Sequence, residues 1–181
     1  MSSHHRSSAH RPLPVIEDLH REVDAQARAV AGRHAARLRC RLGCSGCCID
    51  GLTVFEAEAE RIEAEFSELL RDAEPHPPGA CAFLDAEGAC RIYAARPYVC
   101  RTQGLPLRFF EELEEDGDIV EQRDICPENA EGPSLSTLDD DDCWLIGPFE
   151  ERLMAVQESH QDPAQPLRRV ALRSLFSRSG S

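Results

Sequence analysis

The sequence has no lysine, a single tryptophan, two tyrosines and no long apolar run. All twenty basic side chains are arginine, which excludes a lysine of this chain as a Schiff-base nucleophile or phosphate clamp. A membrane-spanning helix needs about 18 to 20 apolar residues, and no stretch approaches that length. Aromatic residues make up only 6% of the 181 positions. The apolar surface available for a core is therefore small, and cross-links or a bound metal would help to stabilise the fold.

Positive charge is also scarce. The chain has 20 basic and 33 acidic side chains, which gives a formal net charge of -13. A nucleic-acid partner is not expected, because binding phosphate needs a surplus of Lys and Arg on one face. The N-terminus has no apolar run typical of a secretory signal, so we expect a cytoplasmic protein. In that reducing compartment, nine cysteines are more typical of a metal site than of a disulfide framework.

The apolar spacing is typical of a helical protein. Apolar residues recur every three or four positions over three segments, as they do in amphipathic helices. Thr53 lies three residues before Glu56, which is the signature of a capping box and places a helix start there. We therefore predict helices over 15–39, from Thr53 to about Arg71, and over 147–161.

The connecting segments predict little sheet. "CAFLDAEGACRIY" has two short apolar stretches around a turn, and it predicts a short β-hairpin with Cys81 and Cys90 near its ends. Pro97 suits the first turn of a short helical segment. The acidic runs over 111–118 and 139–142 are expected to form solvated loops rather than cation sites.

The length of the chain predicts one domain. We expect a tail without fixed structure over 1–14, a single cysteine-cluster metal-binding domain over 15–160, and a basic amphipathic tail over 161–181. This last segment either touches a protein partner or an anionic surface, or it packs on the protein's own acidic regions. The expected fold class is mainly α, a small irregular metal-stapled helical domain with a short β-hairpin.

The cysteines are concentrated in a few places. "CRLGCSGCC", residues 40–48, holds four of the nine, including a C-x2-C unit whose tight bend lets both sulfurs reach one tetrahedral metal. Further cysteines follow at predicted turns, which favours metal binding over reduced core thiols. The candidate metal ligands are Cys40, Cys44, Cys47, Cys48, Cys81, Cys90, Cys100 and Cys126.

The number of metals is open at this point. Adjacent residues point to opposite sides of an extended backbone, so we expect Cys47 and Cys48 to serve different roles or different metals. Eight ligands suit two four-cysteine sites or one cluster with bridging sulfurs, and thiolates suit zinc, iron or an iron-sulfur cluster. Cys143 is expected to be structural or spare. Four arginines lie beside cysteines, where they either offset thiolate charge or stand by chance: Arg39, Arg41, Arg91 and Arg101.

These motifs together resemble the bacterial cysteine-cluster family called YkgJ-type, a zinc- or iron-chelating domain to which the flagellin lysine N-methylases are similar. The resemblance covers about residues 38–130 and rests on "CRLGCSGCC", "LTVFEAEAERI" and "CAFLDAEGACRIYAARPYVCR". It implies metal chelation by the cysteines, with Arg96, Arg101 and Tyr93 around the ligands. It implies no settled activity, so whether the chain is an enzyme stays open.

Three functions fit the pattern. The favoured one is a protein that holds zinc or iron, with an iron-sulfur cluster among the options. The second is an iron-sulfur enzyme related to protein-lysine N-methylases, because Cys40-x3-Cys44-x2-Cys47 has radical-SAM spacing. Gly46, the preceding helix and a chain too short for the usual barrel weaken this second interpretation. The third is a thiol redox sensor that uses Cys44 and Cys47 as a reactive pair.

Overall fold

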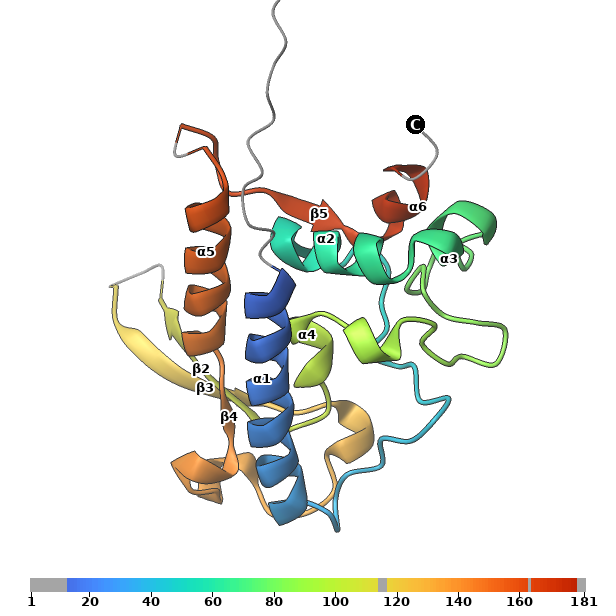
Figure 1. Cartoon of the computed structure of the whole chain (residues 1–181). Helices are drawn as coiled ribbons and strands as arrows, with labels where there is room; N and C mark the ends of the chain where they lie inside the picture. The colour runs from blue at the N-terminus through green and yellow to red at the C-terminus, as the bar shows by residue number, and fades with distance from the viewer. Residues whose placement is uncertain (1–12, 114–116, 163, 179–181) are drawn as a thin grey trace, which may run out of the picture.

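The computed structural model describes residues 13–113, 117–162 and 164–178. Helix α1 (Leu13–Arg33) runs through the middle of the molecule, between α5 and α4 (Figure 1). Its buried apolar residues recur every three or four positions, which confirms the helix predicted from Val15 but ends it before Arg39. Most of the tail predicted over 1–14 lies outside the described residues, but residues 13 and 14 belong to α1.

Two short helices follow the cysteine-rich loop. They are α2 (Glu56–Glu65) and α3 (Ser67–Asp72), which interrupt the single helix predicted to about Arg71. The break is at Phe66, whose φ of -124° and ψ of 29° are not helical. The helical segment was therefore predicted, and the break was not.

The predicted capping box at Thr53 is wrong. Thr53 begins strand β1 (Thr53–Phe55), which pairs antiparallel with β5 (Arg169–Ala171). Phe55 precedes the helix, and its backbone N–H donates to Oε2 of Glu58 at 3.4 Å. The β-branched and aromatic residues of "TVF" favour an extended backbone once a distant strand supplies hydrogen-bond partners.

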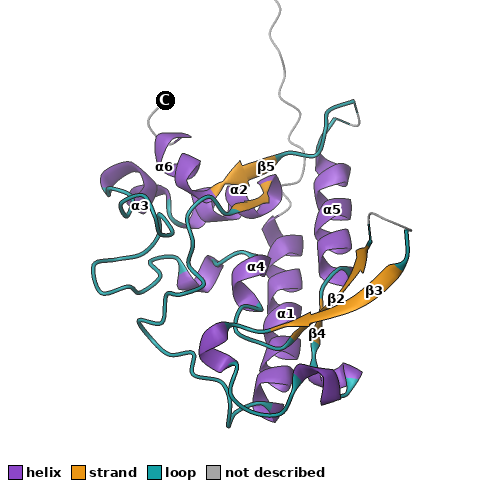
Figure 2. Ribbon diagram, turned by 180° about the vertical axis from the view of Figure 1, so that it is seen from behind, coloured by secondary structure: helices purple, strands orange, loops and turns teal. Residues whose placement is uncertain are grey.

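A three-stranded sheet lies beside α1 and α5 (Figure 2). Its strands are β2 (Leu107–Glu112), β3 (Ile119–Asp124) and β4 (Trp144–Leu145). Strand β2 is central, antiparallel to β3 and parallel to β4. The solvated loop predicted over 111–118 is therefore wrong at its start, because residues 111 and 112 pair with residues of β3. The described fold is a small mixed domain with 45% helix and short strands, which agrees in part with the mainly α domain expected.

The aspartate run is exposed over residues 139–141, as predicted for a solvated segment, but it also forms ion pairs that were not predicted. Residues 140–142 form a single 3-10 turn in which the carboxylates of Asp140 and Asp142 accept from arginines of other elements. Asp140 accepts from Nη2 of Arg108 and from Nη2 of Arg123, each at 2.9 Å. Asp142 accepts from Nε of Arg33 at 2.7 Å. These ion pairs fasten the turn to α1 and to the sheet.

The segment between Cys81 and Cys90 forms a turn rather than a hairpin of two strands. A single antiparallel bridge joins Leu84 and Cys90 within it. The backbone N–H of Arg91 donates to the Phe83 carbonyl at 2.9 Å. The predicted hairpin is thus reduced to one bridge, but both cysteines lie near the ends of the turn, as predicted.

Two helices agree with the sequence patterns. Helix α4 (Tyr98–Arg101) begins directly after Pro97, and α5 (Pro148–His160) buries Phe149 and Leu153 on one face. Within the described residues, none of the helices has the length and apolar character needed to cross a membrane.

The C-terminal segment packs on the body of the protein. Beyond β5 it forms α6 (Leu175–Arg178), and it buries Val170, Leu172 and Leu175. Nη2 of Arg178 donates to Oε1 of Glu56 at 2.9 Å. The described part of the segment therefore follows the second of the two alternatives that its sequence allowed, packing on the protein's own acidic residues.

Candidate metal centre

Seven of the nine cysteines line one cavity of about 410 Å³. The cavity lies among the cysteine-rich loop, the turn that follows Cys81, and α4. In Figure 1 the loop (cyan) and the turn (green) both lie on the α4 side of α1. The cavity-lining cysteines are Cys40, Cys44, Cys47, Cys48, Cys81, Cys90 and Cys100. Every candidate ligand except Cys126 therefore faces the same space.

The cysteine-rich loop is bent by two tight turns. The backbone N–H of Cys44 donates to the Arg41 carbonyl, and that of Cys48 donates to the Ser45 carbonyl, each at 2.9 Å. The C-x2-C unit, Cys44 to Cys47, runs from the last residue of the first turn into the second turn. Because this backbone is turned rather than extended, side chains need not alternate, and Cys47 and Cys48 line the same cavity. The prediction that they face apart is wrong.

Backbone contacts hold the loop against the Cys81 segment. The N–H of Cys81 donates to the Cys48 carbonyl at 2.8 Å. Gly88 has a φ of +78°, and a Cβ at this position would lie 3.6 Å from the Gly43 carbonyl oxygen. A side chain there would be strained by the backbone conformation, and the 3.6 Å separation shows that the turn and the loop are in van der Waals contact. Two segments distant in sequence are thereby brought together at the cavity.

A buried carboxylate positions α4 and thus Cys100. Glu58 is only 3% exposed, and its Oε1 accepts from the backbone N–H of Tyr98 at 2.7 Å. The same oxygen lies 2.9 Å from Nε2 of His20 on α1. Glu58 therefore joins α1, α2 and α4 at one point. Sequence analysis missed both Glu58 and His20, because a single Glu or His in a helix carries no motif.

Burial makes the ionised form of these cavity thiols unfavourable. Burial raises the pKa of Cys81, Cys90 and Cys100, and for Cys100 burial together with the neighbouring Cys81 and Cys90 thiolates raises the pKa to about 12. A hydrogen bond from Cys48 lowers the pKa of Cys47 to about 6, and the same bond raises the pKa of Cys48. These thiols ionise together only if a cation offsets their charge, which is what a thiolate-bound metal does.

Two arginines predicted to surround the ligands do line the cavity. Arg101 is 6% exposed, and its Nη1 donates to Asp24 of α1 at 2.6 Å. The Arg96 guanidinium lies 4.0 Å from the centre of the Tyr93 ring, and Tyr93 also lines the cavity. The cavity lining contains no carboxylate side chain among the described residues. Its polar surroundings therefore favour anionic sulfur.

Several buried arginine N–H groups lack a hydrogen-bond acceptor in the described part of the chain. Within the described part of the chain, no hydrogen-bond partner is found for Nε of Arg91, Arg96 or Arg101. Unsatisfied buried donors are costly, and thiolate or sulfide would be an acceptor for them. This supports the charge-offset interpretation for Arg101, which lines the cavity, whereas Arg91 does not line it. Arg39 instead donates to the Ala36 carbonyl at 2.9 Å and does not line the cavity.

The thiols do not form a coordination shell in this structure. Among residues 13–113, 117–162 and 164–178, no three Cys, His, Asp or Glu side chains lie close enough together to hold a metal ion. The sulfurs share a cavity and would have to move closer together to bind one metal. The assignment of individual ligands therefore stays a prediction.

The region that forms the cavity matches a known family model. Residues 39–127 match CxxCxxCC, described as a "Putative zinc- or iron-chelating domain". This region of the chain belongs to the family. The CxxCxxCC assignment confirms the resemblance to the cysteine-cluster family and supports metal binding, without deciding between zinc and iron. No curated protein and no solved structure matches the chain.

Cys126 lies inside the CxxCxxCC match but does not line the cavity. It precedes a 3-10 turn, Pro127–Asn129, and its carbonyl accepts from the backbone N–H of Asn129 at 2.8 Å. The Asn129 side chain in turn donates to Sγ of Cys40 at 3.4 Å. Cys126 is thus linked to the cavity through Asn129, a residue that sequence analysis missed.

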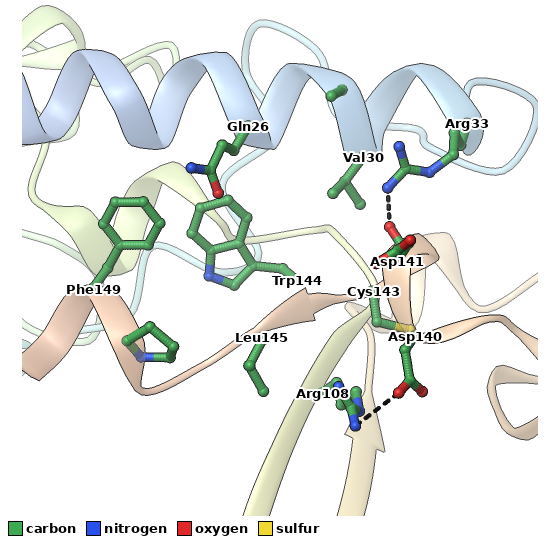
Figure 3. A pocket seen from close by; sticks show the side chains of 12 residues that line it. Gln26, Val30, Arg33, Arg108, Asp140, Asp141, Cys143, Trp144, Leu145 and Phe149 are labelled. Atoms are coloured by element: carbon green, nitrogen blue, oxygen red, sulfur yellow. Dashed lines mark hydrogen bonds and ion pairs between the residues drawn. The ribbon is translucent and has the colours of Figure 1, made fainter.

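Cys143 lies outside the CxxCxxCC match and in a different cavity. That cavity, of about 500 Å³, contains no other cysteine among its described lining residues. Figure 3 shows it beneath α1, with Trp144 and Phe149 on one side and the ion pair between Arg108 and Asp140 on the other. Cys143 is 6% exposed. A structural role for Cys143 stays a prediction.

Proposed function

We propose that this CxxCxxCC protein holds zinc or iron through the thiols that line the 410 Å³ cavity. The observation that carries the proposal is the convergence of seven cysteines from three separate segments on one space. Cysteines with only structural roles have no reason to converge in this way, since thiols pack as small apolar side chains anywhere in a core. All seven lie within the residues that the family model matches.

The charges around the cavity support the same conclusion. A site with four thiolates and a divalent metal has a net charge of about -2, which is costly to bury without nearby cations and donors. Arg96 and Arg101 line the cavity, and both have a buried Nε–H without an acceptor among the described residues. The chain as a whole carries a net charge of -13, so this arginine-rich lining is a local exception.

The metal would also stabilise the fold. The cysteine-rich loop contains no helix or strand between Cys40 and Cys48, and it is held by turns and by one backbone hydrogen bond to Cys81. Structural four-thiolate sites contribute on the order of 10 kcal/mol. Coordination would therefore join the loop to α4 more strongly than the hydrogen bonds do.

Thiols that remain free also suit a reducing compartment such as the cytoplasm.

A second candidate is an iron-sulfur enzyme. Cys40, Cys44 and Cys47 all line the cavity, so the three cysteines with radical-SAM spacing face one space. A four-iron cluster bound by these three would leave one iron open to a substrate or cofactor. A redox sensor is less well supported, because metal bound to Cys44 and Cys47 would block a disulfide between them.

Elemental analysis and visible absorption of protein purified without oxygen test these proposals. Zinc in a colourless protein supports a zinc site and contradicts the iron-sulfur enzyme. A brown protein with iron and acid-labile sulfide supports a cluster. No bound metal, with thiols that react before any chelator is added and respond to an oxidant, would contradict metal binding and favour the redox sensor.

A further inference from the structure

Asn129 is fully buried, and every polar group that it carries has a partner. It is 0% exposed and ends the 3-10 turn that follows Cys126. Its backbone N–H donates to the Cys126 carbonyl at 2.8 Å, and its own carbonyl accepts from Nε of Arg37 at 3.1 Å. An asparagine buried in this way is retained only where its hydrogen bonds are made, because burying an amide otherwise costs free energy.

The side-chain amide of Asn129 connects two segments at the edge of the thiol cavity. Its Oδ1 accepts from the backbone N–H of Arg39 at 2.7 Å. Its Nδ2 donates to the Gly104 carbonyl at 2.8 Å and to Sγ of Cys40 at 3.4 Å. The orientation of the amide is fixed by these partners, because Arg39 offers only a donor and Gly104 only an acceptor. One N–H must therefore face the sulfur.

The absence of a side chain at Gly104 makes room for the Cys40 sulfur. A Cβ at Gly104 would stand 2.6 Å from Sγ of Cys40 and 3.1 Å from Nδ2 of Asn129. Its φ of +90° is also a conformation that other residues rarely adopt. Cys40 is exposed to solvent, and its sulfur accepts from Nδ2 of Asn129 at 3.4 Å. The Cys40 thiol is therefore positioned by Gly104 and Asn129 rather than by burial.

We infer that Asn129 is a positioning residue of the metal site, whose amide N–H holds the Cys40 sulfur as a ligand and stabilises its thiolate. The inference rests on the proposed function, since it assumes that cavity thiols bind metal. A hydrogen bond to a metal-bound thiolate withdraws charge from the sulfur and fixes its direction, so its loss weakens metal binding. The backbone contact between Asn129 and Cys126 also makes this residue the link between the Cys126 segment and the cavity.

The variant Asn129→Asp tests this role. It keeps the size of the side chain and an oxygen to accept from Arg39, but it replaces the N–H that faces Cys40 with an acceptor. We expect cobalt(II), used in place of the native metal, to bind 10- to 100-fold more weakly, which is the usual loss when a partner of a metal ligand is removed. The absorption band for charge transfer from thiolate to cobalt should also change.

Two comparisons separate a role at Cys40 from general destabilisation. Gln157→Glu makes the same amide-to-acid change at a residue that is 3% exposed and does not line the cavity, and it should leave cobalt affinity unchanged. In a Cys40→Ser background, Asn129→Asp should weaken cobalt binding no further, because its target is absent. An equal loss with and without Cys40, or no loss in the single variant, would overturn the inference.

A second measurement on the unmodified sequence covers the case in which Asn129→Asp does not fold. In protein loaded with cadmium-113, a hydrogen bond to a metal-bound sulfur transmits scalar coupling between the metal and the donor N–H. Coupling at the Asn129 side-chain amide supports the inference, and its absence in a cadmium-loaded protein contradicts it. If the wild-type protein binds neither cobalt nor cadmium through its thiols, the proposed function itself fails, and the inference fails with it.

Discussion

Replacing Glu58 with glutamine removes one negative charge from the point where α1, α2 and α4 meet. The carboxylate accepts from the backbone N–H of Tyr98 at 2.7 Å and from that of Phe55 at 3.4 Å, and it lies 2.9 Å from Nε2 of His20. Glutamine has only one acceptor oxygen. Its NH2 group must therefore face one of these donors. The remaining two hydrogen bonds are then made to a neutral amide oxygen instead of a carboxylate.

The size of the effect follows from these bonds. A hydrogen bond to a charged group contributes about 1.5–3 kcal/mol and a neutral one about 0.5–1.5 kcal/mol. Losing the weakest bond and neutralising the other two would cost about 3 kcal/mol, less the lower penalty for burying a neutral amide. We expect the free energy of unfolding of Glu58→Gln to fall by about 2 kcal/mol, which lowers the Tm by about 4–8 °C at this chain length.

Urea unfolding followed by circular dichroism measures this change. Glu63→Gln is the matched control on the same helix, because Glu63 forms a partly exposed ion pair with Arg178 at 3.4 Å. That control should cost less than about 1 kcal/mol. Since Glu58 holds the helix that carries Cys100, metal affinity should fall in Glu58→Gln and not in the control. A loss of stability below about 0.5 kcal/mol in Glu58→Gln would refute the reasoning.

Three further predictions concern metal, pH and the C-terminal segment. Anaerobic removal of the metal should lower the Tm and the helical circular dichroism, and unchanged values would contradict a metal-dependent fold. Burial lowers the pKa of His20 from its ordinary 6.5 despite Glu58. Stability should therefore fall as the pH drops below about 6.5, less steeply in His20→Asn, and equal slopes would contradict this. Arg173 donates to Asp50 at 2.8 Å and to the His76 carbonyl at 2.6 Å. In urea, Arg173→Ala should lose about 2 kcal/mol and the exposed Arg152→Ala less than about 1, and equal losses would contradict the role of Arg173.

The helices were predictable where their pattern is local. Helices α1 and α5 repeat apolar residues every three or four positions, and each such pattern lies within one segment. The sheet was not, because β2 pairs with β4 across a long separation, Leu107 with Trp144. Its acidic residues 111 and 112 are typical of a solvated loop in isolation. These two residues pair with Val120 and Ile119 of β3, which lie close in sequence, so it was their charge that concealed the strand.

For the candidate site too, some features could be predicted from the sequence and others could not. Cysteines were identifiable one by one because their chemistry is distinctive and their spacing is short. The sequence could not indicate that Cys47 and Cys48 share a cavity, since the turn that reorients them depends on backbone hydrogen bonds. Glu58 and Asn129 were missed because their roles depend on buried partners from other segments. A single acid or amide in the sequence does not indicate a role until those partners are known.

The metal content of two cysteine variants tests the central claim most directly. Cys100→Ser removes a thiol from the cavity, and Cys143→Ser removes one from the other cavity, so the two changes are chemically identical. Both proteins are purified without oxygen, and their zinc and iron are measured per chain. The account predicts that Cys100→Ser loses bound metal while Cys143→Ser keeps the wild-type amount. Equal metal content in all three proteins would contradict it.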